Sequence, residues 1–162
     1  MTNTTPVRAE QPMKRILGWD DIMHEVDDLV ARIGTDYDAM LVITRGGMVP
    51  ACLISERLDI RNILVAAVQL YTGIGMTLDA PIFLQFPNDI LLHGKRILIV
   101  DDVWDSGRTA MCVRQRVQVA GGIPTIAVLH YKPRASHFPD HAPDFYAEMT
   151  DNWLVYPWDE ER

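Results

Sequence analysis

The 162-residue chain has few cysteines, no surplus of positive charge and no long hydrophobic run. Two cysteines, Cys52 and Cys112, are too few for a disulfide framework, and their apolar surroundings predict buried free thiols. The 15 basic and 22 acidic residues give a net charge of −7, which argues against a nucleic-acid-binding protein. The apolar run at residues 63–68 is far shorter than the ~20 residues of a transmembrane helix. We therefore expect a cytoplasmic protein without an integral membrane segment.

Most of the negative charge lies in residues 20–38, which hold seven acidic residues and one basic residue, Arg32. The apolar residues of this stretch recur at helical spacing up to Gly34, at positions Ile22, Met23, Val26, Leu29, Val30 and Ile33. We expect an amphipathic helix whose acidic residues form a solvated face.

Strand-like and helical segments alternate along the rest of the chain. Apolar runs typical of buried parallel strands occupy residues 39–44, 62–70, 95–100 and 125–131, and helical periodicity occupies residues 49–58 and 109–120. This alternation predicts an α/β fold, with a largely parallel twisted sheet flanked by helices.

Three segments stand outside the alternating pattern. Residues 1–12 are polar and predict a disordered tail, so that residues 13–162 would form a single domain. Residues 71–93 contain glycines and prolines without a sustained period, which predicts a hairpin or a functional lid. Residues 133–162 are rich in proline, histidine, aspartate and aromatic residues, and we expect them to form a small irregular hood over one edge of the sheet.

Two predicted strand ends carry polar residues, and in parallel sheets ligands bind at these ends. The first reads Thr44-Arg45-Gly46-Gly47, and the second reads ILIVDDVWDSGRT over residues 97–109. In the second, the hydroxyl groups and free amides of residues 105–109 would form a cup for a phosphate. The preceding pair, Asp101 and Asp102, suits sugar hydroxyls or Mg²⁺. A ligand with a phosphate, a diol and a metal-bound pyrophosphate would satisfy all these groups.

The stretch VDDVWDSGRT resembles the phosphoribosyl pyrophosphate (PRPP) motif of type I phosphoribosyltransferases, with Ser106 where threonine is commoner. TRGGMVPACLISERL, at residues 44–58, is similar to the pyrophosphate loop of bacterial xanthine–guanine phosphoribosyltransferases. Residues 131–133 resemble the segment that carries the base-reading lysine of that family, and residues 151–154 with 157–159 resemble its C-terminal base-stacking segment. The four blocks occur in family order.

The resemblance implies an enzyme that transfers the 5-phosphoribosyl group of PRPP to a 6-oxopurine in purine salvage. Guanine, xanthine or hypoxanthine would be the base, and pyrophosphate and a nucleoside monophosphate would be the products. The family assembles as dimers or tetramers, so a homodimer or homotetramer is expected, and Mg²⁺ is the expected cofactor.

The resemblance also implies a role for each matching residue. Asp105 would be the general base near the purine N7, and Asp101 and Asp102 would hold the ribose and Mg²⁺, with Asp102 as the metal ligand. The pyrophosphate would meet Arg45 and Gly46. The remaining groups would bind the 5′-phosphate, through Asp105, Ser106, Gly107, Arg108 and Thr109, and the base, through Lys132, Trp153 and Leu154.

Three alternatives stay open on the sequence alone. One is a phosphoribosyltransferase for another base, such as a pyrimidine. The others are a PRPP-sensing regulator that binds nucleic acid, which the acidic balance disfavours, and a PRPP-binding protein without activity.

Overall fold

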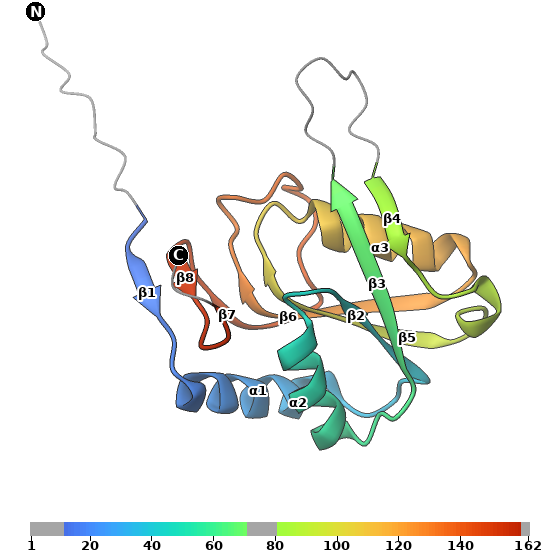
Figure 1. The fold of residues 1–162 in the computed structure, drawn as a ribbon, viewed down its shortest axis with the longest axis horizontal. Helices are drawn as coiled ribbons and strands as arrows, with labels where there is room; N and C mark the ends of the chain where they lie inside the picture. The colour runs from blue at the N-terminus through green and yellow to red at the C-terminus, as the bar shows by residue number, and fades with distance from the viewer. Residues whose placement is uncertain (1–11, 71–80, 160–162) are drawn as a thin grey trace, which may run out of the picture.

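The computed structural model describes residues 12–70 and 81–159, and its centre is a six-stranded sheet (Figure 1). The strands lie in the order β4-β3-β2-β5-β6-β7. All neighbours are parallel except β3 and β4, which are antiparallel. In chain order the strands are β2 (Ala39–Ile43), β3 (Ile63–Leu70), β4 (Pro81–Gln85), β5 (Arg96–Trp104), β6 (Ile123–Tyr131) and β7 (Phe145–Met149). The predicted α/β fold with a largely parallel sheet is confirmed.

Helices cover both faces of the sheet. The first two helices, α1 (Trp19–Ile33) and α2 (Met48–Leu58), pack on one face, and α3 (Arg108–Val119) packs on the other (Figure 1). A short 3₁₀ turn, η1 (Asp89–Leu91), precedes β5. Each residue of β2 is buried, since alternate side chains enter the two core layers, and this explains the uninterrupted apolar run.

The termini of the described chain form a second, two-stranded sheet. β1 (Lys14–Ile16) pairs in parallel with β8 (Trp153–Val155), with Lys14 opposite Trp153. The Leu17 amide extends the pairing by donating to the Val155 carbonyl at 2.9 Å. The predicted irregular hood is therefore correct only in part, because residues 145–149 are the regular strand β7 at the edge of the main sheet.

Some local expectations are wrong or fall outside the described chain. Cys52 is exposed and Cys112 is half-buried, so the expected burial of both thiols is wrong for Cys52 and only partly met by Cys112. The predicted tail, apart from its last residue, and residues 71–80 of the predicted lid lie outside the described residues. Among the described helices, none is long and apolar enough to cross a membrane.

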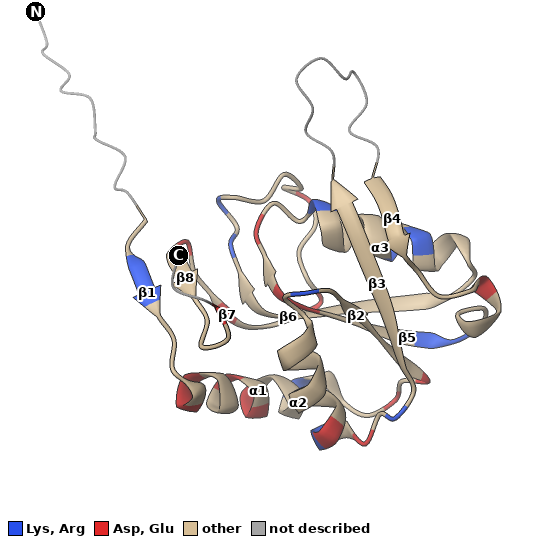
Figure 2. Cartoon of the chain, viewed as in Figure 1, with Lys and Arg blue, Asp and Glu red and all other residues tan. Residues whose placement is uncertain are grey.

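The acidic face of α1 is only partly solvated. Asp20, Asp21, Asp27 and Asp28 are exposed, and Figure 2 shows acidic residues along this helix. Glu25 differs, because it is only 9% exposed. The expectation of a solvated acidic face is therefore wrong for Glu25.

The turn from β5 into α3 depends on a glycine. Gly107 caps α3 with a φ of +78°, and a Cβ at this position would lie 2.4 Å from the indole of Trp104. Trp104 is 1% exposed, and its Nε1 donates a hydrogen bond to the Ser136 Oγ at 3.1 Å. The indole cannot move aside without disturbing the core, so no side chain fits at residue 107.

We predict that Gly107→Ala destabilises the protein much more than Gly94→Ala. Gly94 also has a positive φ, +71°, but a Cβ there would meet nothing within 4 Å, so its cost is backbone strain alone, about 1–3 kcal/mol. At Gly107 overpacking against Trp104 adds roughly another 1–3 kcal/mol. Urea unfolding of the two variants measures the difference, and equal losses would contradict the proposed clash.

Candidate active site

The acid pair, Asp101 and Asp102, lies inside β5 rather than after it. The strand continues to Trp104, with Asp101 opposite Val128 and Val103 opposite His130 of β6. The sequence predicted an end at residue 100 because the apolar run stops there. Pairing continues because the polar side chains lie at the carboxyl edge of the sheet, where they line a cavity.

The loop between β2 and α2 lies directly against the acid pair. A Cβ on Gly46 would come within 2.5 Å of the Asp102 carboxyl group, and a Cβ on Gly47 would come within 2.5 Å of the Val100 carbonyl oxygen. The peptide bond between Thr44 and Arg45 is cis. Two consecutive glycines are thus required for this loop to reach β5, and they bring the Arg45 backbone to the rim of the same cavity.

Residues 105–109, which the sequence predicts to bind a phosphate and which we call the phosphate loop, lead from the end of β5 into the first turn of α3. The Arg108 amide donates to the Ser106 Oγ at 3.3 Å, and the Ser106 carbonyl accepts from the His137 amide at 2.9 Å. Thr109 lies in the first turn of α3 and lines the cavity. The N-terminal amides of the 12-residue helix have no carbonyl partners within the helix and its dipole is positive at this end, so the loop is suited to an anion.

Lys132 lies beside Asp105 of the phosphate loop, and Trp153 lies beside Lys132. The Lys132 side chain is 13% exposed, and its Nζ lies 3.9 Å from Asp105 Oδ2. The same Nζ lies 6.0 Å from the centroid of the Trp153 ring, which belongs to a residue that is 61% exposed. A cationic donor and an open aromatic face therefore lie close to an exposed carboxylate.

A cavity of about 1300 Å³ joins these parts. Of the residues predicted from the sequence, its lining contains Arg45, Gly46, Asp101, Asp102, Thr109, Trp153 and Leu154. The other predicted residues, Lys132 and residues 105–108, adjoin it through Trp153 and Thr109.

Lys14 of β1, for which the sequence predicts no role, also lines the cavity. Its place follows from the pairing of Lys14 with Trp153 across β1 and β8, which no local pattern signals. Trp158 stacks on Tyr156 with ring centroids 4.7 Å apart and also lines the cavity.

Burial disfavours the ionised forms of both carboxyl groups of the acid pair. Burial raises the pKa of Asp101 well above its usual range, and the neighbouring Asp102 raises it further. Burial also raises the pKa of Asp102, and the negative charge of Asp159 raises it further. Two adjacent carboxylates whose ionised forms are disfavoured in this way fit a hard divalent cation such as Mg²⁺.

We predict that Asp101→Asn raises the Tm of the ligand-free protein at neutral pH. A carboxyl group whose folded-state pKa is raised binds more protons in the folded than in the unfolded state, so its ionisation lowers stability as the pH rises. Asparagine removes this loss, and each kcal/mol regained should raise the Tm by about 2–4 °C.

The gain should shrink as the pH falls towards the ordinary aspartate pKa of about 3.9, where the wild-type carboxyl group is protonated as well. Thermal unfolding in magnesium-free buffer at several pH values tests this, with Asp140→Asn, which changes an exposed carboxylate, as the control. A Tm difference that does not depend on pH would contradict the explanation.

Comparisons with known proteins agree with this geometry. Residues 13–161 match the model of the phosphoribosyl transferase domain family. A xanthine-guanine phosphoribosyltransferase from Ruegeria sp. (strain TM1040) is 31% identical over 98% of this chain and 93% of its own length.

Two solved structures share the fold over nearly the whole chain. The crystal structure of a purine phosphoribosyltransferase from Pyrococcus horikoshii is 32% identical with a TM-score of 0.79, covering 92% of this chain and 95% of the other. A hypothetical protein from Neisseria gonorrhoeae, crystallised with bound ppGpp, is 29% identical with a TM-score of 0.79, covering 93% and 92%. With its PRPP-type motif set beside a glycine loop in one cavity, the chain belongs to the phosphoribosyltransferase family.

Proposed function

We propose that the protein transfers the 5-phosphoribosyl group of PRPP to a 6-oxopurine, releasing pyrophosphate and forming a nucleoside monophosphate. The observation that carries the proposal is a single cavity that joins the acid pair and the glycine loop to Trp153 and Leu154. The relatives named as xanthine-guanine and purine phosphoribosyltransferases support it.

The two phosphate-bearing ends of PRPP are assigned to two different loops. The phosphate loop would bind the 5′-phosphate through the amides at the start of α3 and the hydroxyls of Ser106 and Thr109. Arg45 and the Gly46 amide would bind the pyrophosphate, where a cation and a close backbone stabilise the leaving group.

The acid pair would hold Mg²⁺ and the ribose hydroxyls, with Asp102 as the metal ligand. When bound, Mg²⁺ would supply positive charge to the pyrophosphate oxygens. The raised pKa values of both aspartates support this role, since a bound cation would relieve the unfavourable burial of their charges.

The remaining task of the protein is to align the two reactants. Positive charge develops at C1′ of the ribose as pyrophosphate departs, so a rigid cavity that places the purine nitrogen in line accelerates transfer by orientation. We assign Asp105 as the general base that accepts the purine N7 proton. Its support is the proximity of Asp105 Oδ2 to Lys132 Nζ, which places the carboxylate beside the base-binding residues.

Lys132 and Trp153 would select the base. An indole stacks on any purine, with a contribution of roughly 1–3 kcal/mol per base. The Lys132 ammonium can donate to the carbonyl oxygen of a 6-oxopurine, but it would meet a donor in the 6-amino group of adenine. A buried polar mismatch costs more than a lost contact, so adenine should be strongly rejected.

We predict activity with guanine, xanthine or hypoxanthine and little activity with adenine, measured as pyrophosphate release from PRPP in the presence of Mg²⁺. Lys132→Met should lower kcat/KM for the 6-oxopurines by at least about tenfold, the effect of a lost charge-assisted hydrogen bond, and narrow the gap to adenine. Trp153→Ala should weaken binding of all bases alike.

The same panel separates the alternatives. A preference for adenine or uracil would contradict the base-selecting roles of Lys132 and Trp153. It would not contradict the assignment of the other residues to PRPP. Binding of PRPP without turnover of any base would identify a silent PRPP-binding protein. Ile90→Ala, which truncates an exposed apolar side chain outside the cavity lining, is the control for Trp153→Ala.

We also propose that ppGpp, a guanosine nucleotide with two pyrophosphate groups, competes for this cavity. The support is the Neisseria gonorrhoeae neighbour with bound ppGpp, together with the purine, ribose and pyrophosphate groups that ppGpp shares with the proposed substrates. Calorimetric titration should show that saturating PRPP with Mg²⁺ weakens ppGpp binding by at least about tenfold. If saturating PRPP leaves the affinity for ppGpp unchanged, ppGpp does not compete with PRPP for this cavity.

A further inference from the structure

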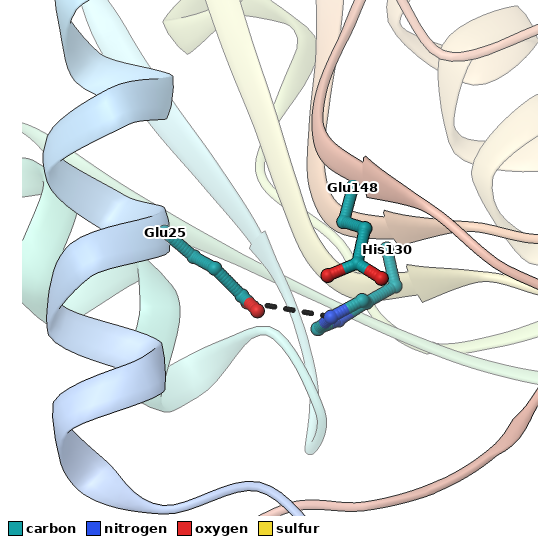
Figure 3. Close-up of side chains that lie close together, drawn as sticks. All are labelled: Glu25, His130 and Glu148. Atoms are coloured by element: carbon teal, nitrogen blue, oxygen red, sulfur yellow. Dashed lines mark ion pairs between the residues drawn. The ribbon is translucent and has the colours of Figure 1, made fainter. Parts of the chain in front are cut away.

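A second cluster of metal-ligating side chains lies outside the cavity described above. Glu25 of α1, His130 of β6 and Glu148 of β7 converge, each offering one ligand atom, and these atoms lie within 4.8 Å of one another (Figure 3). His130 is 0% exposed, Glu25 is buried and Glu148 is half-buried. The proposed phosphoribosyl transfer uses none of the three.

Two atoms of this cluster face each other without hydrogen-bond partners among the described residues. His130 Nε2 and Glu25 Oε2 are buried and 3.3 Å apart, but their contact lacks the geometry of a hydrogen bond. Such atoms are rare in folded proteins, because an unpaired buried polar group is unfavourable. A partner beyond the described protein atoms is therefore needed to satisfy this pair.

The Tyr156 hydroxyl indicates what that partner must be. It donates to the Asp102 carbonyl oxygen at 3.4 Å and lies 3.0 Å from His130 Nδ1. The hydroxyl can accept a hydrogen bond from Nδ1–H while it donates to the Asp102 carbonyl oxygen, and the imidazole tautomer that does so carries a lone pair at Nε2, next to the Glu25 carboxylate. In that tautomer, two electron-rich atoms so close together call for a cation between them.

The distance favours a metal ion over a proton. A hydrogen bond between an imidazolium and a carboxylate is about 2.7–2.9 Å long, shorter than the 3.3 Å found here. Zinc bonds of about 2.0–2.2 Å in a tetrahedral site separate neighbouring ligand atoms by about 3.3–3.6 Å, and the His130–Glu25 pair matches this separation. The three ligand atoms together lie within 4.8 Å of one another, so the Glu148 side chain would move inward when the ion binds. One imidazole with two carboxylates suits zinc and similar transition metals better than Mg²⁺.

Arg15 leaves room for this ion. Its Nη1 donates to Glu148 Oε1 at 2.5 Å, and its Nη2 lies 4.0 Å from Glu25 Oε1, so it approaches neither Nε2 nor the unpartnered Oε2 of Glu25. With a neutral imidazole, Arg15, Glu25 and Glu148 together carry a charge of −1, which attracts a cation. Hydrogen-bonded ligand carboxylates and a paired second imidazole nitrogen are regular features of metal sites.

We propose that Glu25, His130 and Glu148 form a binding site for a zinc-type divalent transition-metal ion, with Tyr156 and Arg15 orienting the ligands. The ion would join α1 to β6 and β7 and is distinct from the Mg²⁺ assigned to the acid pair. Through Tyr156 it would also stiffen the segment that carries β8.

The test is a titration of the untagged, chelator-treated full chain with Co²⁺, followed by visible absorption. We expect saturation at one ion per chain, displacement by Zn²⁺ and a higher Tm with Zn²⁺. The isosteric changes Glu25→Gln and Glu148→Gln should each weaken Co²⁺ binding at least tenfold. Tyr156→Phe, which keeps the ring but removes the hydroxyl on Nδ1, should weaken it about 10–100-fold.

Two controls separate this site from other metal-binding groups. The double variant Asp101→Asn/Asp102→Asn removes the acid pair and should bind Co²⁺ as the wild type does. His24→Gln removes an exposed histidine whose Nε2 lies 3.5 Å from Asp28 on the same helix, and it should also leave binding unchanged. Circular dichroism verifies that each variant is folded.

Three results would overturn the proposal. One is the absence of saturable Co²⁺ binding, and another is a folded Glu25→Gln variant that binds as tightly as the wild type. The third is binding that disappears only in the acid-pair variant. The first two would indicate that a proton, rather than a metal ion, lies between His130 and Glu25.

Discussion

The contact of the Gly46–Gly47 loop with β5 is the constraint on which the active site depends. A side chain at either position would collide with the Asp102 carboxyl group or with the Val100 carbonyl oxygen. Because β2 and β5 are adjacent parallel strands, their carboxyl ends meet at one edge, and the glycines turn that edge into a surface where a loop and two acids touch. The order of the strands and the absence of two side chains thus together create the half of the cavity that we propose to bind PRPP.

This half could be predicted from the sequence because its determinants are local. The apolar run of β2, the glycines after it and the acids after residues 97–100 are each contiguous, and parallel-sheet topology alone brings them to the same edge. The extension of β5 through the acid pair could not be predicted, since polar residues within a strand break the apolar pattern on which the prediction depends.

The base half depends on contacts between distant parts of the chain. β1 and β8 are separated by almost the whole sequence, so nothing near Lys14 signals that it lies opposite Trp153 and lines the cavity. Glu25 lies on a helix whose acidic composition predicts solvation. Its burial reflects a break in the side-chain alternation of β6. Val128 and His130 are two residues apart and would share a face in a regular strand, but Val128 packs on the α3 side and His130 meets Glu25 of α1. A one-residue change of phase moves a side chain to the other face, and only the folded sheet reveals it.

The two halves of the cavity, which we propose to bind PRPP and the base, are therefore held in place by different parts of the fold. This difference affects how the choice of base can change by substitution. Asp102 is held by β5 and by the glycine loop, both part of the central sheet. Trp153 lies on a three-residue strand that pairs with β1 rather than with the central sheet. Near its end, Tyr156 links this strand to the sheet through its hydroxyl, which lies between His130 and the Asp102 carbonyl. Substitutions along β1 and β8 can thus reshape the Trp153 side of the proposed base site while Asp102 and Lys132 keep their positions, because those two residues are held by strands buried between two helical layers.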